Sequence, residues 1–152
     1  MTTTERKTRV DLARNAPAVY KAMIALDAAA RQGLEPELVE LVLTRCSQIN
    51  HCAWCIDMHT AGARKIGVSE QKLFLLNAWE EAQGLYTEKE RAAFALAEAI
   101  TVLTDGFVPD SVYEGAQEYF DETELAQLIS LVLTINAWNR IAVSTRMSPQ
   151  AR

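Results

Sequence analysis

The sequence CSQINHCAWCIDMH, residues 46–59, joins the end of one predicted helix to the start of the next. It contains all three cysteines of the 152-residue chain and both of its histidines. Thiols and imidazoles gathered in one short window are typical of two kinds of site, a metal centre or a reactive dithiol with a proton relay. The residues around the window indicate which of the two fits better.

Helical patterns continue on both sides of this window. Apolar residues recur at helical spacing, and no alternating pattern typical of a strand is long enough to compete. Capping residues, prolines at helix starts and glycines after helix ends mark the boundaries. Helices are therefore expected from near Asn15 to before Gly33, from Glu35–Pro36 onward, from the CxxC to about Lys65, from Ser69 to Gly84, from Thr87 to about Thr104, from Pro109–Asp110 onward, and from Asp121 onward.

These patterns predict an all-α bundle of about seven helices. A chain of 152 residues has the size of one domain and can bury a core without disulfides. Residues 1–152 are thus expected to form a single domain, with loose polar tails at residues 1–8 and 147–152. The Ala-rich helices also carry long apolar stretches, which predict a homo-oligomer because one small bundle cannot cover so much apolar surface.

Composition narrows the range of partners. The chain has 15 Lys and Arg against 20 Asp and Glu, a net charge of −5. Nucleic acids and anionic membranes favour a basic face, so neither partner is expected. No apolar run approaches the roughly 18 residues of a membrane helix, and MTTTERKTRV lacks the apolar centre of a signal peptide. We therefore predict a cytoplasmic protein. In the reducing cytoplasm, a close cysteine pair is expected to be catalytic or metal-binding rather than to form a structural disulfide.

Cys52 and Cys55 form a CxxC pair at a predicted helix start. Residues three apart on a helix are neighbours, so the two sulfurs can form a disulfide with little backbone movement. The free N–H groups and the positive dipole end of a helix start also favour a thiolate over a thiol. Such settings lower the pKa of a cysteine from about 8.5 to roughly 3.5–7.5, and the thiolate is the nucleophilic form.

His59 and Glu40 are candidates for a proton relay to this pair. His59 lies one helical turn after Cys55 and two turns after Cys52, so it serves Cys55 more directly. Cys55 is therefore predicted to be the attacking thiol, and Cys52 the thiol that resolves the oxidised adduct into a disulfide. Glu40 interrupts the apolar run LVELVL. It can orient His59 if it faces the cysteine helix, and is otherwise an exposed carboxylate.

Two other interpretations stay open. Zinc would take Cys46, Cys52, Cys55 and His59 as ligands and stabilise an interaction module, although three of these lie on one helix and no second CxxC exists. A disulfide oxidoreductase or redox sensor would use the same cysteine pair without efficient peroxide turnover. Taken singly, Cys46 fits a small buried residue and His51 a solvated residue at the helix entry.

Glu40, eleven intervening residues and then Cys52-x-x-Cys55-x-x-x-His59 resembles the active-site signature of the alkylhydroperoxidase D (AhpD)-like proteins of the carboxymuconolactone decarboxylase superfamily. INAWNR at 135–140 also resembles the late helix of single-domain members. The resemblance implies an all-α AhpD-like fold, trimers or hexamers, and a peroxidase without haem, flavin or metal. It implies a peroxidatic Cys55, a resolving Cys52 and a relay of His59 with Glu40. It also implies a hydroperoxide substrate and an external dithiol reductant, lipoyl or thioredoxin-like.

Overall fold

The computed structural model describes residue 7 and residues 9–151, and this part of the chain contains helices and no strands. The elements are α1 (Leu12–Asn15), α2 (Pro17–Ala30), α3 (Pro36–Ile49), α4 (Ala53–Lys65), α5 (Glu70–Leu75), the 3₁₀ turn η1 (Leu76–Ala78), α6 (Glu88–Thr101), α7 (Asp110–Gln117) and α8 (Glu122–Thr145). Helices α2 to α8 correspond to the seven predicted ones, so the all-α class is confirmed. The tail predicted at residues 1–8 falls, apart from residue 7, outside the described residues.

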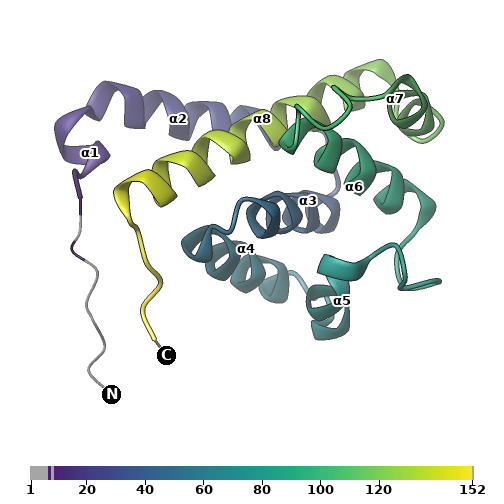
Figure 1. Ribbon diagram of the computed structural model, residues 1–152, viewed down its shortest axis with the longest axis horizontal. Coiled ribbons are helices and arrows are strands. Elements are labelled where there is room, and N and C mark those ends of the chain that lie inside the picture. The colour runs from purple at the N-terminus through teal and green to yellow at the C-terminus, as the bar shows by residue number, and fades with distance from the viewer. Residues whose placement is uncertain (1–6, 8, 152) are drawn as a thin grey trace.

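Helix α3 forms the centre of the bundle. It packs against α4, α6 and α8, which surround it in Figure 1. Its Leu41, Val42 and Leu43 are fully buried, because neighbours cover the helix on several sides. Glu40 lies within this apolar run, so its carboxylate is held close to the protein interior. The central position of α3 is what brings this carboxylate up to the helix that carries the cysteine pair.

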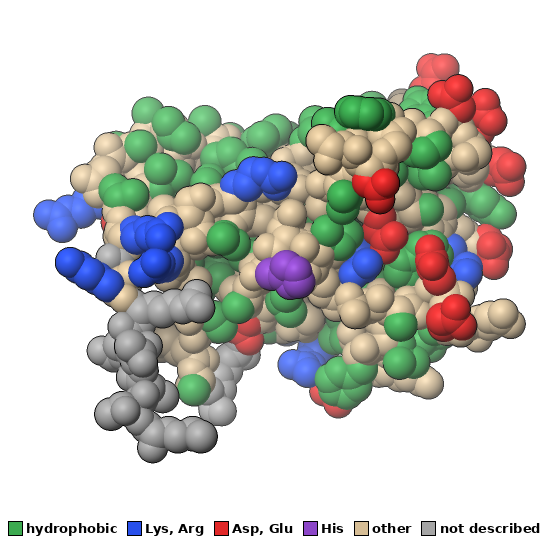
Figure 2. Space-filling model, viewed as in Figure 1, with side chains coloured by type: hydrophobic (Ala, Val, Ile, Leu, Met, Phe, Trp, Pro, Cys, Tyr) green, Lys and Arg blue, Asp and Glu red, His purple; other side chains and the backbone are tan. Residues whose placement is uncertain are grey.

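Helix α2 lies outside this core, along α8 (Figure 1). Among its 14 residues only Ala30 is buried. Val19, Ile24 and Leu26 leave about half of their surface exposed, at 54%, 53% and 45%. Hydrophobic side chains are correspondingly frequent over α2 in the space-filling view (Figure 2). A mainly apolar helix with so little burial is unusual for a monomer.

The helix predicted from Ser69 to Gly84 ends earlier than expected. Helix α5 stops at Leu75, and turns follow η1. Contacts with α6 account for the difference, because Arg91 donates hydrogen bonds to the carbonyl oxygens of Trp79 and Glu80 at 3.0 and 3.3 Å. The Trp79 indole in turn donates to Glu98 at 2.7 Å. Tertiary contacts of this kind override local helix propensity.

The chain also forms one helical turn that the sequence patterns did not predict. Asp11 accepts a hydrogen bond from the N–H of Arg14 and so caps the four-residue helix α1. At the other end, α8 has 24 residues and is the longest helix. Neither it nor any other helix of the described residues combines the length and apolar character that crossing a membrane requires.

Candidate active site

The turn between α3 and α4 places the cysteine pair. The N–H of His51 donates to the carbonyl of Gln48 at 3.1 Å, and the N–H of Cys52 donates to that of Ser47 at 3.0 Å. These two bonds form the Schellman arrangement that ends helices, with His51 at the left-handed position usually taken by glycine (φ 52°). Cys52 follows at once as the N-cap of α4. One turn therefore closes α3 and starts the CxxC helix.

Cys52 and Cys55 are joined by a disulfide, and their Cα atoms are 5.3 Å apart. The N–H of Cys55 also lies 3.3 Å from the Cys52 sulfur, which accepts its hydrogen bond. Both cysteines are buried. The free N–H groups at the start of α4 thus act on Cys52 more directly than on Cys55.

Glu40 faces α4 and meets His59. Its Oε2 lies 3.1 Å from His59 Nδ1, so the carboxylate faces the cysteine helix instead of being an exposed group. His59 is buried, and its Nε2 makes no hydrogen bond within the described part of the chain. Gly62, one turn further along α4, permits this approach, because a Cβ there would lie 3.2 Å from Glu40 Oε2.

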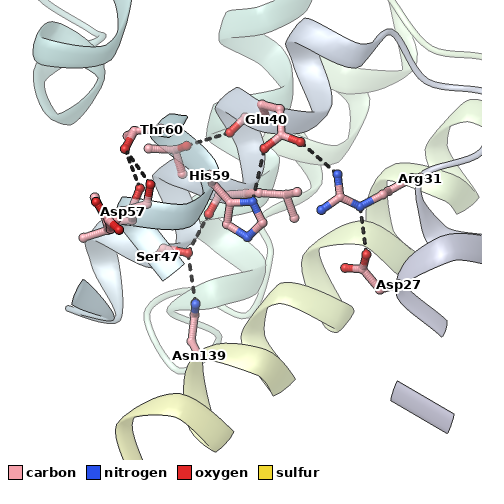
Figure 3. A network of polar contacts seen from close by, with 11 residues as sticks. Asp27, Arg31, Glu40, Ser47, Asp57, His59, Thr60 and Asn139 are labelled. Atoms are coloured by element: carbon pink, nitrogen blue, oxygen red, sulfur yellow. Dashed lines mark hydrogen bonds and ion pairs between the residues drawn. The ribbon is translucent and has the colours of Figure 1, made fainter. Parts of the chain in front are cut away.

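Arg31, just after α2, completes a chain of charged groups that the sequence patterns did not indicate (Figure 3). Its Nη1 lies 2.9 Å from Glu40 Oε1, and its Nε lies 2.8 Å from Asp27 Oδ2. Burial of the Glu40 carboxyl would raise its pKa, but the hydrogen bonds from His59 and Arg31 outweigh that effect and lower it. A cation near a helix end usually faces solvent, so only the packing of α2 revealed this contact.

A cluster of amide side chains fixes the α3–α4 turn to α8. Asn50 Nδ2 donates to the side-chain oxygens of Asn136 and Asn139, at 3.0 and 2.9 Å. Asn139 Nδ2 donates to Ser47 Oγ at 3.0 Å (Figure 3). Asn136 and Asn139 belong to the INAWNR sequence at residues 135–140. Asn139 is buried and Asn50 and Asn136 are half-buried, and amides that satisfy one another in this way hold a backbone in one arrangement.

Cys46 stands apart from the disulfide. It is buried on α3, as predicted, and its sulfur accepts a hydrogen bond from Thr101 Oγ1 at 3.4 Å. Burial raises the pKa of its thiol to about 12, so it stays protonated. Among the described residues, no group of three or more His, Cys, Asp and Glu side chains is arranged to hold a metal ion. The ligand set of the zinc interpretation is therefore not assembled.

A groove of about 1030 Å³ opens beside the start of α4. His51, Cys52 and Trp54 line one wall of the groove, and residues 9–13 and the end of α8 line the other walls. Cys55 is not among the lining residues. The groove therefore approaches the disulfide from the side of Cys52.

Comparison with known proteins identifies relatives of this arrangement. Residues 17–99 match the model of the carboxymuconolactone decarboxylase family. The uncharacterized protein YdfG of Bacillus subtilis is 39% identical over 137 residues, which cover 90% of this chain and 92% of YdfG. A crystal structure from Agrobacterium tumefaciens, of a protein of unknown function suggested to be the antioxidant defence protein AhpD, has a TM-score of 0.92 at 36% identity and covers 96% of this chain and 100% of its own.

The same fold also carries another chemistry. The debrominase Bmp8, in a C82A variant complexed with 2,3,4-tribromopyrrole, has a TM-score of 0.81 at 18% identity. The match covers 92% of this chain and 74% of Bmp8. At that identity the likeness concerns the fold alone, so the reaction must be argued from the site.

Proposed function

Because the chain belongs to the carboxymuconolactone decarboxylase family, as an AhpD-like member, we propose that it is a thiol peroxidase that reduces hydroperoxides without haem, flavin or metal. One observation carries the proposal: a CxxC disulfide lies on the same helix as a buried histidine that is hydrogen-bonded to a carboxylate. A redox-active pair and a group able to move a proton are what a two-cysteine peroxidase requires.

The reaction starts from the reduced pair. Cys55 transfers its proton to Nε2 of His59, and the thiolate attacks the terminal oxygen of the hydroperoxide. The O–O bond breaks, the imidazolium returns the proton to the departing alkoxide, and an alcohol leaves while Cys55 becomes a sulfenic acid. The thiol of Cys52 then displaces the hydroxyl as water and forms the Cys52–Cys55 disulfide. The oxidised pair in the structure corresponds to this end of the cycle.

An external dithiol restores the two thiols by exchange, and is itself oxidised to a disulfide. The groove beside Cys52 gives such a donor a route to the pair. A lipoyl group and a thioredoxin-like protein both supply this chemistry. Recycling of this kind needs a reducing compartment, so the proposal includes a cytoplasmic location.

A disulfide oxidoreductase is the second candidate, and one observation favours it. The Cys52 sulfur, not that of Cys55, accepts the N–H at the start of α4, and Cys52 lines the groove. A helix start stabilises a thiolate, so Cys52 would be the attacking thiol in that activity. The two candidates thus assign the nucleophile to different cysteines.

Stopped-flow oxidation of the reduced protein by tert-butyl hydroperoxide separates the two candidates. For a peroxidase, Cys55→Ser abolishes turnover, whereas Cys52→Ser stops at a sulfenic acid that dimedone traps. The matched control is Cys46→Ser, which changes a buried thiol outside the site and should keep wild-type turnover. Oxidation no faster than that of free cysteine, together with rapid exchange with a disulfide substrate, would instead establish the oxidoreductase. Turnover retained by both Cys55→Ser and Cys52→Ser would eliminate both candidates.

We also propose that the protein is a homo-oligomer, a trimer or hexamer as the family resemblance implies. The exposed apolar residues Val19, Ile24 and Leu26 on α2 support an interface between copies. Sedimentation velocity at micromolar concentration should show a single species larger than a monomer, which Ile24→Glu should dissociate. A monomer as the sole wild-type species would disprove assembly.

A further inference from the structure

Among the residues that the structure describes, Arg31 is the one basic residue that hydrogen-bonds to the Glu40–His59 pair. It directly follows α2 as its C-cap residue, whereas Glu40 lies on α3 and His59 on α4. Its guanidinium is shared by two carboxylates: Nε bonds to Asp27 Oδ2 at 2.8 Å and Nη1 bonds to Glu40 Oε1 at 2.9 Å. The planar, permanently charged fork of arginine suits such a double contact, and a lysine cannot reproduce it.

Both oxygens of Glu40 are thereby occupied. Oε1 accepts from Arg31, and Oε2 faces His59 Nδ1 at 3.1 Å, as Figure 3 shows. Only 14% of the Glu40 side chain is exposed, so water contributes little to holding it. The carboxylate direction is therefore set by protein groups, and Arg31 is the one that carries a full positive charge when the imidazole is neutral.

This direction determines which imidazole nitrogen carries the proton. An ionised Glu40 can only accept, so the neutral imidazole must place its proton on Nδ1. The lone pair is then on Nε2, a buried atom that makes no hydrogen bond to the described residues. A protonated or rotated Glu40 would release this constraint and allow the proton to sit on Nε2, where it would remove the base.

We propose that Arg31 is a positioning residue: by holding Glu40 against His59 Nδ1, it fixes the tautomer whose Nε2 takes the proton of Cys55. The inference rests on the proposed peroxidase function for its kinetic consequence, although the tautomer itself does not depend on it. Asp27, Arg31 and Glu40 together carry one negative charge, which the imidazolium neutralises during proton transfer. Asp27 contributes by orienting Arg31 rather than by touching the histidine.

The test combines NMR spectroscopy with kinetics on the full-length reduced protein. The chain has only two histidines, so two-bond ¹⁵N–¹H correlations can report the tautomer of His59 beside the exposed His51 as an internal reference. Wild-type His59 should show Nδ1–H, and Arg31→Met should shift the neutral ring toward Nε2–H. Oxidation of Cys55 by tert-butyl hydroperoxide should slow about tenfold or more at pH 7, which is part of the roughly 10²–10⁴-fold that a general base contributes. Arg31→Lys should recover part of the rate.

The matched control is Arg45→Met, which removes a comparable partly buried Arg–Glu pair, Arg45–Glu98, away from His59. It should leave the tautomer and the oxidation rate within twofold of wild type. If Arg31→Met does not fold, Asp27→Asn is measured in the same two ways, since it loosens Arg31 but keeps Glu40. An unchanged tautomer and rate in the folded Arg31 or Asp27 variant would overturn the inference. If the wild-type protein does not react with peroxide but Arg31→Met still shifts the His59 tautomer, only the peroxidase function is overturned.

Discussion

Replacing Gly62 by alanine should lower activity while leaving the fold intact. In the interior of a helix this change normally stabilises a protein by about 0.5–1 kcal/mol. Here the new Cβ would lie 3.2 Å from Glu40 Oε2 and 3.3 Å from its Cδ, closer than ordinary contacts allow. The carboxylate must therefore retreat by a few tenths of an ångström. That movement stretches the 3.1 Å contact with His59 Nδ1 toward the limit of a hydrogen bond.

The expected size of the effect follows from this contact. A hydrogen bond to a charged group contributes about 1.5–3 kcal/mol. Losing roughly half of it raises the barrier to proton transfer by about 1 kcal/mol, which corresponds to a rate about fivefold lower. The gain in helix propensity offsets much of the loss in stability, so the midpoint of urea unfolding should change little.

Gly115→Ala is the matched control, because Gly115 lies inside α7 and a Cβ added there would meet no described residue within 4 Å outside its own turn of helix. This variant should be stabilised by about 0.5–1 kcal/mol and keep the wild-type rate. Both variants are measured by urea denaturation and by stopped-flow oxidation with tert-butyl hydroperoxide. Gly62→Ala protein that is as stable and as fast as Gly115→Ala would show that the Glu40 position does not limit the reaction.

Three further predictions concern the turn and the relay. His51→Gly should raise the free energy of unfolding by about 1 kcal/mol, because glycine takes the left-handed conformation without strain. A urea midpoint equal to or lower than that of the wild type would contradict the strain assigned to His51 at the end of α3. Asn139→Ala should lower the free energy of unfolding by about 1–3 kcal/mol, because Asn139 is buried and its partners lose their hydrogen bonds. Asn50→Ala should act non-additively with Asn139→Ala, because the two side chains share one hydrogen-bond network. Strict additivity in a double-mutant cycle would argue against that network. The lowered pKa of Glu40 gives the folded state stability that is present above the ordinary value of 4.5 and lost as pH falls through the folded pKa. Glu40→Gln should therefore flatten the stability profile as pH falls below 4.5, and an unchanged profile there would refute this assignment.

Local sequence rules predicted several helix starts and part of the candidate site. Capping residues located the starts of α5, α6 and α8, where Ser69, Thr87 and Asp121 accept the expected backbone hydrogen bonds. The cysteine pair and His59 could be placed on one helix because residues three and four apart share a face whatever the rest of the fold does. The turn before Cys52 was less predictable, since His51 occupies a conformation for which glycine would have been the usual sign.

The sequence by itself determined the helical class, the CxxC at a helix start and the histidine one turn beyond it, because these depend on helix geometry within a few residues. Only the tertiary structure decided that Glu40 faces His59, that Arg31 holds Glu40 and that Gly62 leaves room for it. These contacts join three helices, and their existence depends on how α2, α3 and α4 are packed. Hydrophobic periodicity shows which face of each helix is buried, but it does not specify which side chains meet across two faces.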